Sequence, residues 1–276
     1  MTSRALLVRS RPRFWLYLAG PVLVGAVYAA ESVGGLFTPT VLVLFGYFLV
    51  PANLFLYGIN DVFDADADRK NPKKADRESR YRGDAATRWS VTLSFALGFA
   101  LLAITPTVAA PWLLGFLVLG AAYSAPPLRL KTRPPLDSLS NGLYILPGAT
   151  AYAAVAGTTP PALALLGGWL WAMAMHTFSA IPDIEPDRRA GIETTATRLG
   201  GHLATVYCGS VWALAAGVFA LLDHRLGLLM LAYPILLAGI TLGEVDLERA
   251  YWWYPAVNAS IGMVFTLGGL WALLCG

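Results

Sequence analysis

Long apolar stretches dominate the chain and are separated by short polar segments. Nine of them approach the roughly 20 apolar residues that a helix needs to cross a hydrocarbon core about 30 Å thick. The expected spans are 14–30, 37–60, 89–107, 111–124, 138–156, 162–182, 203–221, 226–243 and 254–274. The pattern predicts an all-α, polytopic membrane protein with nine transmembrane helices, in which residues 1–276 form one domain.

Composition supports the membrane class. Apolar residues make up 57% of the chain and charged residues 13%, whereas about 25% of an average soluble domain is charged. These proportions exclude a soluble domain, a disordered chain and a nucleic-acid-binding module. Cys208 and Cys275 lie in apolar runs and are expected to be small buried hydrophobes, neither a disulfide framework nor a metal pair.

Charge is concentrated on one side of the predicted topology. With nine crossings, 19 of the 20 Lys and Arg residues share a face, and Arg225 is left on the other. The positive-inside rule places the crowded face in the cytoplasm. Because 15 of the 17 acids lie there too, we expect a multi-pass protein of the cell membrane whose active-site mouth is cytoplasmic.

Two acidic motifs stand out on that face. Asn60, Asp64 and Asp68 are spaced i, i+4, i+8, which places them on one face of a helix, and Tyr57 continues the stripe into the membrane. Asp183 and Asp187 repeat the spacing 119 residues after Asp64. Both motifs are predicted near helix C-termini, where like charges and the macrodipole make carboxylates unfavourable. A cation is needed to offset them.

Carboxylate sets without nearby His or Cys suit a hard cation, and Mg²⁺ is commonly shared between one or two carboxylates and substrate phosphates. Two such sets, emerging on the same side, would bind a diphosphate through bridging metals, with Arg and Lys on its oxygens. Solvated loops are the alternative for these acids. A calcium loop beginning at Asp64 is excluded, because Arg69 and Ala75 occupy the required Gly and Glu positions.

A third polar set comprises Arg129, Lys131 and Arg133, followed by Asp137, Asn141 and Tyr144 on one face of a predicted helix. These residues would form either a diphosphate-contacting lid or a plain topology signal. His176, two turns before Asp183, would accept a proton in the reaction chamber or simply bond a neighbouring helix. The aromatic run 251–254 is expected to lie in the interfacial belt.

The chain resembles the UbiA-type intramembrane prenyltransferases. Asn60, Asp61, Asp64 and Asp68 match the family's first signature, and Asp183 and Asp187 match the second, followed by Arg188, Arg189 and a Gly-Ile-Glu-Thr-Thr segment. The Ser-Arg-Pro sequence before the first span fits as well, so the similarity covers essentially the whole chain. The resemblance implies a prenyltransferase domain, a helical bundle around a central cavity open laterally to lipid.

It also implies Mg²⁺-dependent ionisation of an isoprenyl diphosphate, with two ions bridging the diphosphate, and attack by a lipophilic acceptor. The family's catalytic residues map to Asp64, Asp68, Asp183 and Asp187, which with Asn60 would also bind the metal. Aromatic faces would shield the carbocation. Substrate contacts are expected from Asn60, Asp61, Arg129, Lys131, Tyr57, Tyr144, Asn141, Asp137, Arg188 and His176.

The motif wording is most similar to the carotenoid branch, the lycopene elongases, some of which are also hydratases. That resemblance implies dimethylallyl diphosphate (DMAPP) as donor and a terminal double bond of lycopene as nucleophile in C50 carotenoid biosynthesis. Proton loss or water would quench the resulting tertiary cation. An aromatic or lipid acceptor, of the quinone, haem, chlorophyll or glycerol-phosphate type, is the alternative. A transporter would instead place its acids near the bilayer midplane.

Overall fold

The computed structural model describes residues 7–68 and 85–275, with the backbone alone described for residues 65–68. Within these ranges every regular element is helical, which confirms the all-α prediction. The chain falls into two compact units. Unit 1 comprises Met1–Arg129, Leu146–Thr159 and Gly262–Gly276, and unit 2 comprises Leu130–Ile145 and Pro160–Ile261. Neither unit is one contiguous stretch, and the single-domain expectation stays a prediction.

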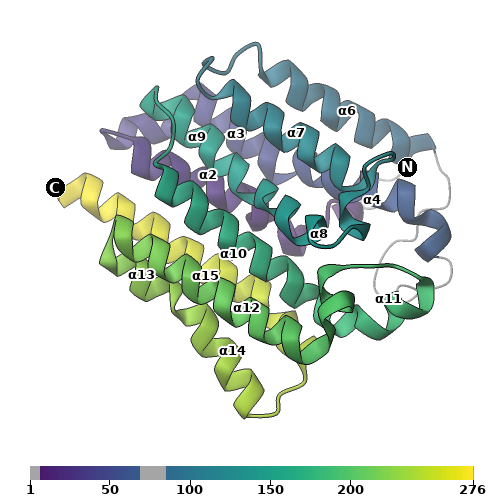
Figure 1. Cartoon of the computed structure of the whole chain (residues 1–276). Helices are drawn as coiled ribbons and strands as arrows, with labels where there is room; N and C mark the ends of the chain where they lie inside the picture. Colours follow the sequence, from purple (N-terminus) through teal and green to yellow (C-terminus); the bar gives the residue numbers. More distant parts are fainter. Residues whose placement is uncertain (1–6, 69–84, 276) are drawn as a thin grey trace. The chain divides into compact units, whose positions relative to one another are not determined.

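Among the residues that the structure describes, unit 1 contains six helices and the end of a seventh, each of which is labelled in Figure 1. Short 3-10 turns, η1 (Pro12–Phe14) and η2 (Val33–Phe37), lie on either side of the first helix. The helices are α2 (Trp15–Ala29), α3 (Pro39–Leu49), α4 (Pro51–Asp68), α6 (Ala85–Leu101), α7 (Ala110–Ser124), α9 (Leu146–Ala156) and the last part of α15 (Leu247–Cys275).

Helices α2 and α9 meet backbone to backbone. A Cβ added to Gly25 of α2 would lie 2.1 Å from the carbonyl oxygen of Gly148 in α9. A Cβ on Gly148 would in turn lie 2.8 Å from the carbonyl oxygen of Pro21. Small residues permit this close approach, which is a common way to pack helices inside a membrane.

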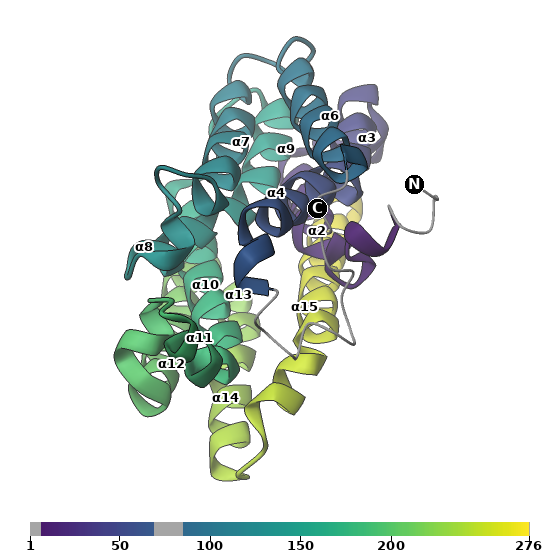
Figure 2. The ribbon, with the colours of Figure 1, turned by 90° about the vertical axis from the view of Figure 1, so that its right-hand side faces the viewer.

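The predicted span 37–60 is two helices, with the break at Val50 (φ −125°, ψ −59°). Pro51 causes the break, because proline lacks an N–H and disfavours helical geometry in the preceding residue. Asn53 bridges the break by donating from Nδ2 to the carbonyls of Phe48 and Leu49, both at 3.0 Å. Helix α4 then continues to Asp68 and carries the whole first acidic motif (Figure 2).

Unit 2 begins with three short elements, η3 (Leu130–Thr132), α8 (Leu136–Leu139) and η4 (Ser140–Ile145). Helix α10 (Ala162–Ala180) runs beside α12 (Thr195–Leu222), as Figure 1 shows. Between them lie η5 (Ile181–Asp183) and α11 (Ile184–Ala190). Helices α13 (His224–Met230) and α14 (Ala232–Leu242) and the first part of α15 complete the unit.

The predicted helix 138–156 is wrong in its first half. Residues 136–145 form one turn of α-helix and then a 3-10 segment, and the regular helix begins at Leu146. Gly142 lies against the ring of Trp169, where an added Cβ would come within 1.9 Å of a ring carbon. Asp137, Asn141 and Tyr144 therefore do not share the α-helical face predicted for them.

Aromatic side chains form the core of unit 2. Trp212 stacks on Tyr254 with ring centroids 5.9 Å apart, and Phe178 lies 4.5 Å from Tyr254. Tyr233 completes the cluster, and its hydroxyl donates to Asn258 Oδ1 at 2.8 Å or accepts from the amide if that group is flipped. Tyr254 is only 2% exposed, so it belongs to the core and not to the predicted interfacial belt.

The protein is a multi-pass membrane protein. Five stretches of the described residues are long and apolar enough to cross a membrane, Pro39–Asp64, Ala162–Ala190, Thr195–Leu222, His224–Leu242 and Leu247–Cys275, and α7 is a shorter apolar helix. The remaining predicted spans coincide with shorter helices, and the count of nine stays a prediction.

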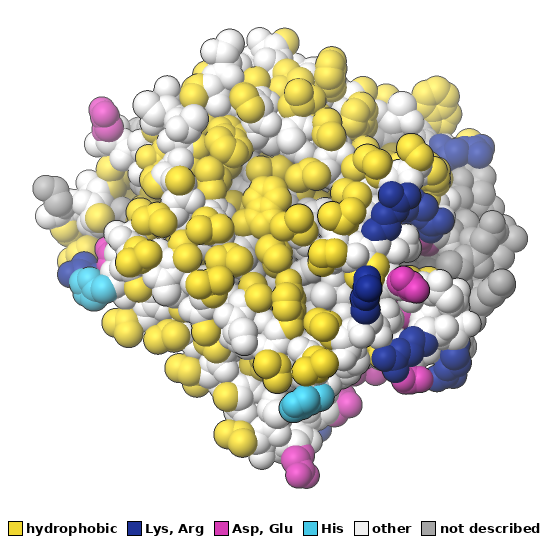
Figure 3. All heavy atoms as spheres, in the orientation of Figure 1, with side chains coloured by type: hydrophobic (Ala, Val, Ile, Leu, Met, Phe, Trp, Pro, Cys, Tyr) yellow, Lys and Arg dark blue, Asp and Glu magenta, His cyan; other side chains and the backbone are white. Residues whose placement is uncertain are grey.

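Large apolar side chains lie on the outside of both units. Leu221 of α12 is 75% exposed and Leu242 of α14 is 86% exposed in unit 2, and Trp271 of α15 is 70% exposed in unit 1. Exposure on this scale marks a surface made for a nonaqueous environment. On the face drawn in Figure 3, hydrophobic side chains cover the helices, and Lys and Arg side chains gather near α8 and α11.

Candidate active site

The first acidic motif lies at the end of α4 in unit 1. Asp61 is 8% exposed, and its Oδ1 accepts a hydrogen bond from Arg11 Nη2 at 3.2 Å. The same guanidinium lies over the ring of Tyr57, with Cζ 4.7 Å from the centroid. Arg11 thus connects the segment before η1 to α4 by an ion pair and a cation–π contact.

Asp64 is paired with a second arginine. Arg129 Nη2 donates to Asp64 Oδ1 at 3.1 Å, and the Asp64 side chain is 16% exposed. Asn60, one turn earlier, accepts from Ser124 Oγ at 3.1 Å. The predicted Asn60–Asp64 stripe therefore exists on one helix face. The Asp68 side chain lies outside the described residues, although its backbone continues α4.

Arg11 and Arg129 both adopt positive φ angles, 50° and 40°. Such conformations are sterically costly for a residue with a side chain, and strained residues gather at functional sites. In both cases the strained backbone belongs to an arginine whose guanidinium reaches a carboxylate of α4. The cations that the acidic motif requires are therefore supplied from two distant parts of the chain.

The second acidic motif differs from its prediction in one respect. Asp183 is exposed and is the N-cap residue of α11, and the half-buried Asp187 lies in the first turn of that helix. Carboxylates at a helix N-terminus face the positive end of the macrodipole. The predicted position near the end of a helix is kept, since Asp183 follows the end of α10 by three residues; the difference is that a short helix, α11, begins at the motif.

Arg188 attaches this motif to the following helix. Its Nη2 donates to the carbonyl of Thr197 at 2.9 Å, and its Nη1 pairs with Glu185 Oε1 at 3.1 Å. Thr194 and Thr197 form a capping box at the start of α12. Gly200, with φ 76°, then breaks the helix, so the capped turn 195–199 is a separate support for α11.

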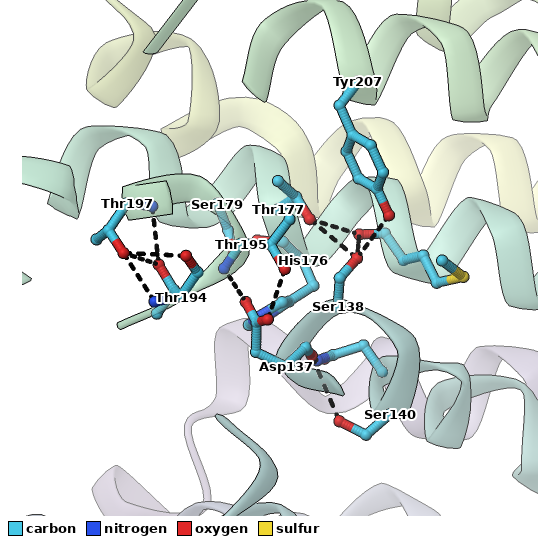
Figure 4. A network of polar contacts seen from close by, with 12 residues as sticks. Asp137, Ser138, Ser140, His176, Thr177, Ser179, Thr194, Thr195, Thr197 and Tyr207 are labelled. Carbon is cyan, nitrogen blue, oxygen red and sulfur yellow. Dashed lines mark hydrogen bonds and ion pairs between the residues drawn. The ribbon is translucent and has the colours of Figure 1, made fainter. Parts of the chain in front are cut away.

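Asp137 and His176 lie in a buried polar network of unit 2 (Figure 4). Asp137 has no exposed surface, and its carboxylate accepts hydrogen bonds from Thr195 N at 2.8 Å and Thr195 Oγ1 at 2.5 Å. His176 Nε2 lies 3.7 Å from Asp137 Oδ2, an ion-pair distance. Asn141 Nδ2 donates to the backbone carbonyl of Asp137 at 2.6 Å.

Burial alone would raise the pKa of Asp137, because it disfavours the charged form. The contacts with His176 and Thr195 outweigh that effect and hold the pKa of this carboxyl below its usual range. Asp137 is therefore a carboxylate whose oxygens are already engaged by protein groups. These contacts join Asp137 to the start of α12 and to His176, and its direct contact with substrate stays a prediction.

The remaining predicted residues are partly exposed. Lys131 lies in η3 and Tyr144 in η4, both half-buried in unit 2. Arg133 is exposed just after η3. The first and second acidic motifs belong to different units, and their meeting across one cavity stays a prediction.

Sequence reasoning missed three partners of the site. Arg11 and Thr195 were recognised only as parts of the Ser-Arg-Pro and Gly-Ile-Glu-Thr-Thr segments, and Ser124 was not singled out. The Pro after Arg11 and the Thr-Thr pair before α12 are signals of fixed backbone geometry that would have found two of them. Their partners lie 50 or more residues away in sequence.

The oxygen donors suit a hard metal ion shared with substrate. Among the described side chains, no group of three or more His, Cys, Asp or Glu residues encloses a site alone. Asn60 and Asp64 share a helix face, and Asp183 and Asp187 lie four residues apart. Mg²⁺ usually takes one or two carboxylates and completes its shell with water and phosphate oxygens. The residues therefore fit such an ion.

A helical membrane fold with paired Asp motifs at helix ends defines the class, and the sequence matches it. The model of the UbiA prenyltransferase family matches residues 18–273, and the chain belongs to this family of enzymes. The resemblance stated from the motifs is thereby confirmed.

Particular relatives share most of the chain. The lycopene elongase/hydratase of Halobacterium salinarum is 64% identical over 274 residues, covering 99% of both chains. The lycopene elongase/hydratase of Haloferax volcanii is 59% identical and covers 98% of this chain and 90% of its own. A solved structure of a UbiA homolog from Archaeoglobus fulgidus bound to DMAPP and Mg²⁺ shares the fold, with a TM-score of 0.76, 21% identity, and coverage of 99% and 100%.

Proposed function

We propose that this chain is a lycopene elongase that transfers a dimethylallyl group from DMAPP to an end of lycopene, with or without hydration of the product. The observation that carries the proposal is 64% identity across 99% of both chains with a lycopene elongase/hydratase. The acid–arginine pairs on α4 support it, because they provide both the charges that a metal diphosphate needs and the cations that contact phosphate oxygens.

The reaction breaks the bond between the allylic carbon and the diphosphate oxygen, and the electron pair leaves with the diphosphate. A terminal double bond of lycopene then forms the new carbon–carbon bond, which leaves a tertiary cation on the neighbouring carbon. Water addition or proton loss ends the reaction. Two Mg²⁺ ions bound with the diphosphate would supply Lewis-acid stabilisation of the leaving group.

The chain's own residues have separate tasks in this scheme. Asn60, Asp64, Asp68, Asp183 and Asp187 would hold the metal, and Arg129, Lys131 and Arg188 would contact the diphosphate. Arg129 Nη2 already lies 3.1 Å from Asp64 Oδ1, so binding the diphosphate requires it to exchange a carboxylate partner for a phosphate oxygen. Tyr57 and Tyr144 would shield the allylic cation with their ring faces.

The metal requirement is tested by chelation. Removing divalent cations with a chelator should stop C5 transfer by the purified protein, and adding Mg²⁺ back should restore it, because no protein cation can replace the charge of two metal ions at the departing diphosphate. Turnover is followed by chromatography of the carotenoids. Full activity in chelator would contradict the metal assignment.

The acceptor is tested by expressing the chain in a lycopene-producing bacterium and measuring pigment masses. Lycopene plus one or two C5 units, with or without water, is the expected result. Cells carrying an empty vector and cells expressing Asp64→Ala are the matched controls. If lycopene is unchanged while the protein is folded in the membrane, the acceptor is an aromatic or lipid compound instead.

A further inference from the structure

One segment of unit 1, residues 124–129, places hydrogen-bond donors on two oxygens of the first acidic motif. Ser124 is the last residue of α7 and has no exposed surface, and its hydroxyl donates to Asn60 Oδ1 at 3.1 Å. Five residues later, Arg129 Nη2 donates to Asp64 Oδ1 at 3.1 Å. Two of the residues proposed to hold the metal therefore accept hydrogen bonds from the same segment of the chain.

The backbone of this segment is held in place by a turn. After α7 ends, the N–H of Arg129 donates to the carbonyl of Ala125 at 3.0 Å, which closes one turn. Arg129 adopts φ 40° at the end of that turn, a costly conformation for a residue with a side chain. Because the turn fixes the backbone of Arg129, only its side chain has to move for the guanidinium to leave Asp64.

The Asp64–Arg129 pair opposes the binding of a metal ion that arrives alone. A divalent cation on the Asp64 carboxylate would lie beside the guanidinium, which is 3.1 Å from Oδ1, and like charges repel each other. Both side chains are only partly exposed, 16% for Asp64 and 39% for Arg129, so salt screens this repulsion incompletely. A guanidinium that simply left the carboxylate would lose its charge-assisted hydrogen bond.

A diphosphate changes this balance because it offers the guanidinium another anion. Arginine can bind phosphate oxygens through two parallel hydrogen bonds, which suits the planar guanidinium. When Arg129 makes that contact, the Asp64 carboxylate becomes available to a metal ion. Each of the two ligands therefore removes an obstacle to the binding of the other.

We infer that the Asp64–Arg129 pair makes the metal ion and the diphosphate bind together, because it withholds Asp64 from a metal ion until a diphosphate takes Arg129. Such coupling is reciprocal, so each ligand raises the affinity for the other by the same factor. Arg129 then weakens binding of the metal alone and strengthens binding of the metal diphosphate. The inference rests on the proposed function, since that function assigns Asp64 to the metal and Arg129 to the diphosphate.

The first test measures binding of Mn²⁺ alone to the purified protein, from the loss of the unbound ion's electron paramagnetic resonance signal. Mn²⁺ takes the same oxygen ligands as Mg²⁺. In Arg129→Gln the dissociation constant should fall about tenfold, because repulsion between a divalent and a monovalent cation a few ångströms apart is worth at least that factor even in water.

Arg11→Gln is the matched control for this measurement. Arg11 is likewise paired with a carboxylate of α4, Asp61, at 3.2 Å. Its replacement removes the same charge but does not release Asp64, and it should change the dissociation constant by less than about threefold, since solvent and salt screen the longer distance. When Asp64→Asn is added to Arg129→Gln, the tighter Mn²⁺ binding should disappear.

The second test measures binding of radiolabelled inorganic pyrophosphate in excess Mg²⁺, with no carotenoid present. Its affinity should fall about tenfold in Arg129→Gln, the loss expected for one hydrogen bond to a charged group. The two measurements therefore change in opposite directions. A residue that only supported the fold would weaken both kinds of binding when replaced.

Mn²⁺ binding in Arg129→Gln that is no tighter than in Arg11→Gln, a gain that survives Asp64→Asn, or an unchanged affinity for pyrophosphate would each overturn the inference. None of these results would touch the proposed function, since both binding tests are made without carotenoid. A wild-type chain that adds no C5 unit to lycopene would instead overturn the proposed function.

Discussion

Arginine supplies the charge balance of the first acidic motif in the absence of substrate. Arg11 is committed to Asp61 and Tyr57 together, which fixes it in place. Arg129 pairs with Asp64, and its side chain is 39% exposed, against 21% for Arg11. The two arginines therefore differ in how accessible their guanidinium groups are to an incoming diphosphate. We propose that Arg129, the more exposed of the two, passes from a carboxylate to a phosphate oxygen when the diphosphate binds.

Arg129→Ala should raise the KM for DMAPP about tenfold, the loss expected for one hydrogen bond to a charged group. The KM of Arg129→Lys should lie between those of the wild type and of Arg129→Ala, because lysine cannot make the planar, bidentate contact. The KM is obtained from initial rates measured at varied DMAPP concentrations. Arg225→Ala, at an exposed cation predicted on the opposite side of the membrane, is the control. An unchanged KM in Arg129→Ala would exclude the phosphate contact.

Asp64→Ala and Asp183→Ala should each abolish turnover, because each removes an oxygen donor for the metal. Neither change should unfold the protein, since Asp183 is exposed and the Asp64–Arg129 pair is partly exposed, and such pairs contribute little to stability. Turnover and the thermal melting point of the purified variants test both statements. Glu31→Ala, a distant acid predicted on the other face, should change neither. Near-normal turnover in either Asp variant would make the metal assignment wrong.

At the scale of the element, helix packing depends on a few small residues. Gly25→Ala should destabilise unit 1 by about 1–3 kcal/mol, a typical cost of overpacking, because the new methyl group meets the Gly148 carbonyl. Gly20→Ala on the same helix has nothing within 4 Å of its added Cβ and should be neutral or slightly stabilising. Thermal unfolding in detergent compares the two, and equal melting points would contradict the close approach.

The sequence predicted helices well and their interruptions poorly. The i, i+4 spacing of Asn60 and Asp64 correctly extended a helix through a charged segment, because side-chain period is a local property. Pro51 was a visible breaker inside the predicted span 37–60, yet the apolar pattern outweighed it. In the 3-10 segment at 140–145, Gly142 lies against Trp169, a contact 27 residues away in sequence that a local pattern does not reveal.

Local sequence patterns also failed to reveal the contacts between distant segments at the candidate site. Residue types and spacing identified the two acidic motifs, because the chemistry of metal and diphosphate binding demands carboxylates at fixed intervals. They could not reveal that Arg11 pairs with Asp61, or that Thr195 engages Asp137, since each pair joins segments 50 or 58 residues apart. Only folding brings such partners together, and it places Asp137 against Thr195 and His176.

At the scale of the whole molecule, the uneven charge distribution predicts orientation. A cysteine placed at Arg225 should react with an impermeant maleimide added outside intact cells, whereas one placed at Arg189 should react only after the cells are opened. Cys275 is exposed, contrary to the expectation from sequence, so the labelling is done in a Cys275→Ser background; Cys208 is buried as expected and should not react. Labelling of the Arg189 site from outside would reverse the predicted topology.

Unit 1 also contains the end of the last helix, and this has a consequence for the order of assembly. Gly269 of α15 lies against α2, where an added Cβ would be 2.8 Å from Val27 Cγ1. Gly25 likewise packs against Gly148 of α9, which is synthesised later. During synthesis the first helix enters the membrane long before its partners exist. The Gly25 face of α2 therefore stays against lipid until Gly148 has been made, 123 residues later, and the face at Val27 until Gly269 has been made, 242 residues later. A ribosome that stops before α15 leaves α2 incompletely covered.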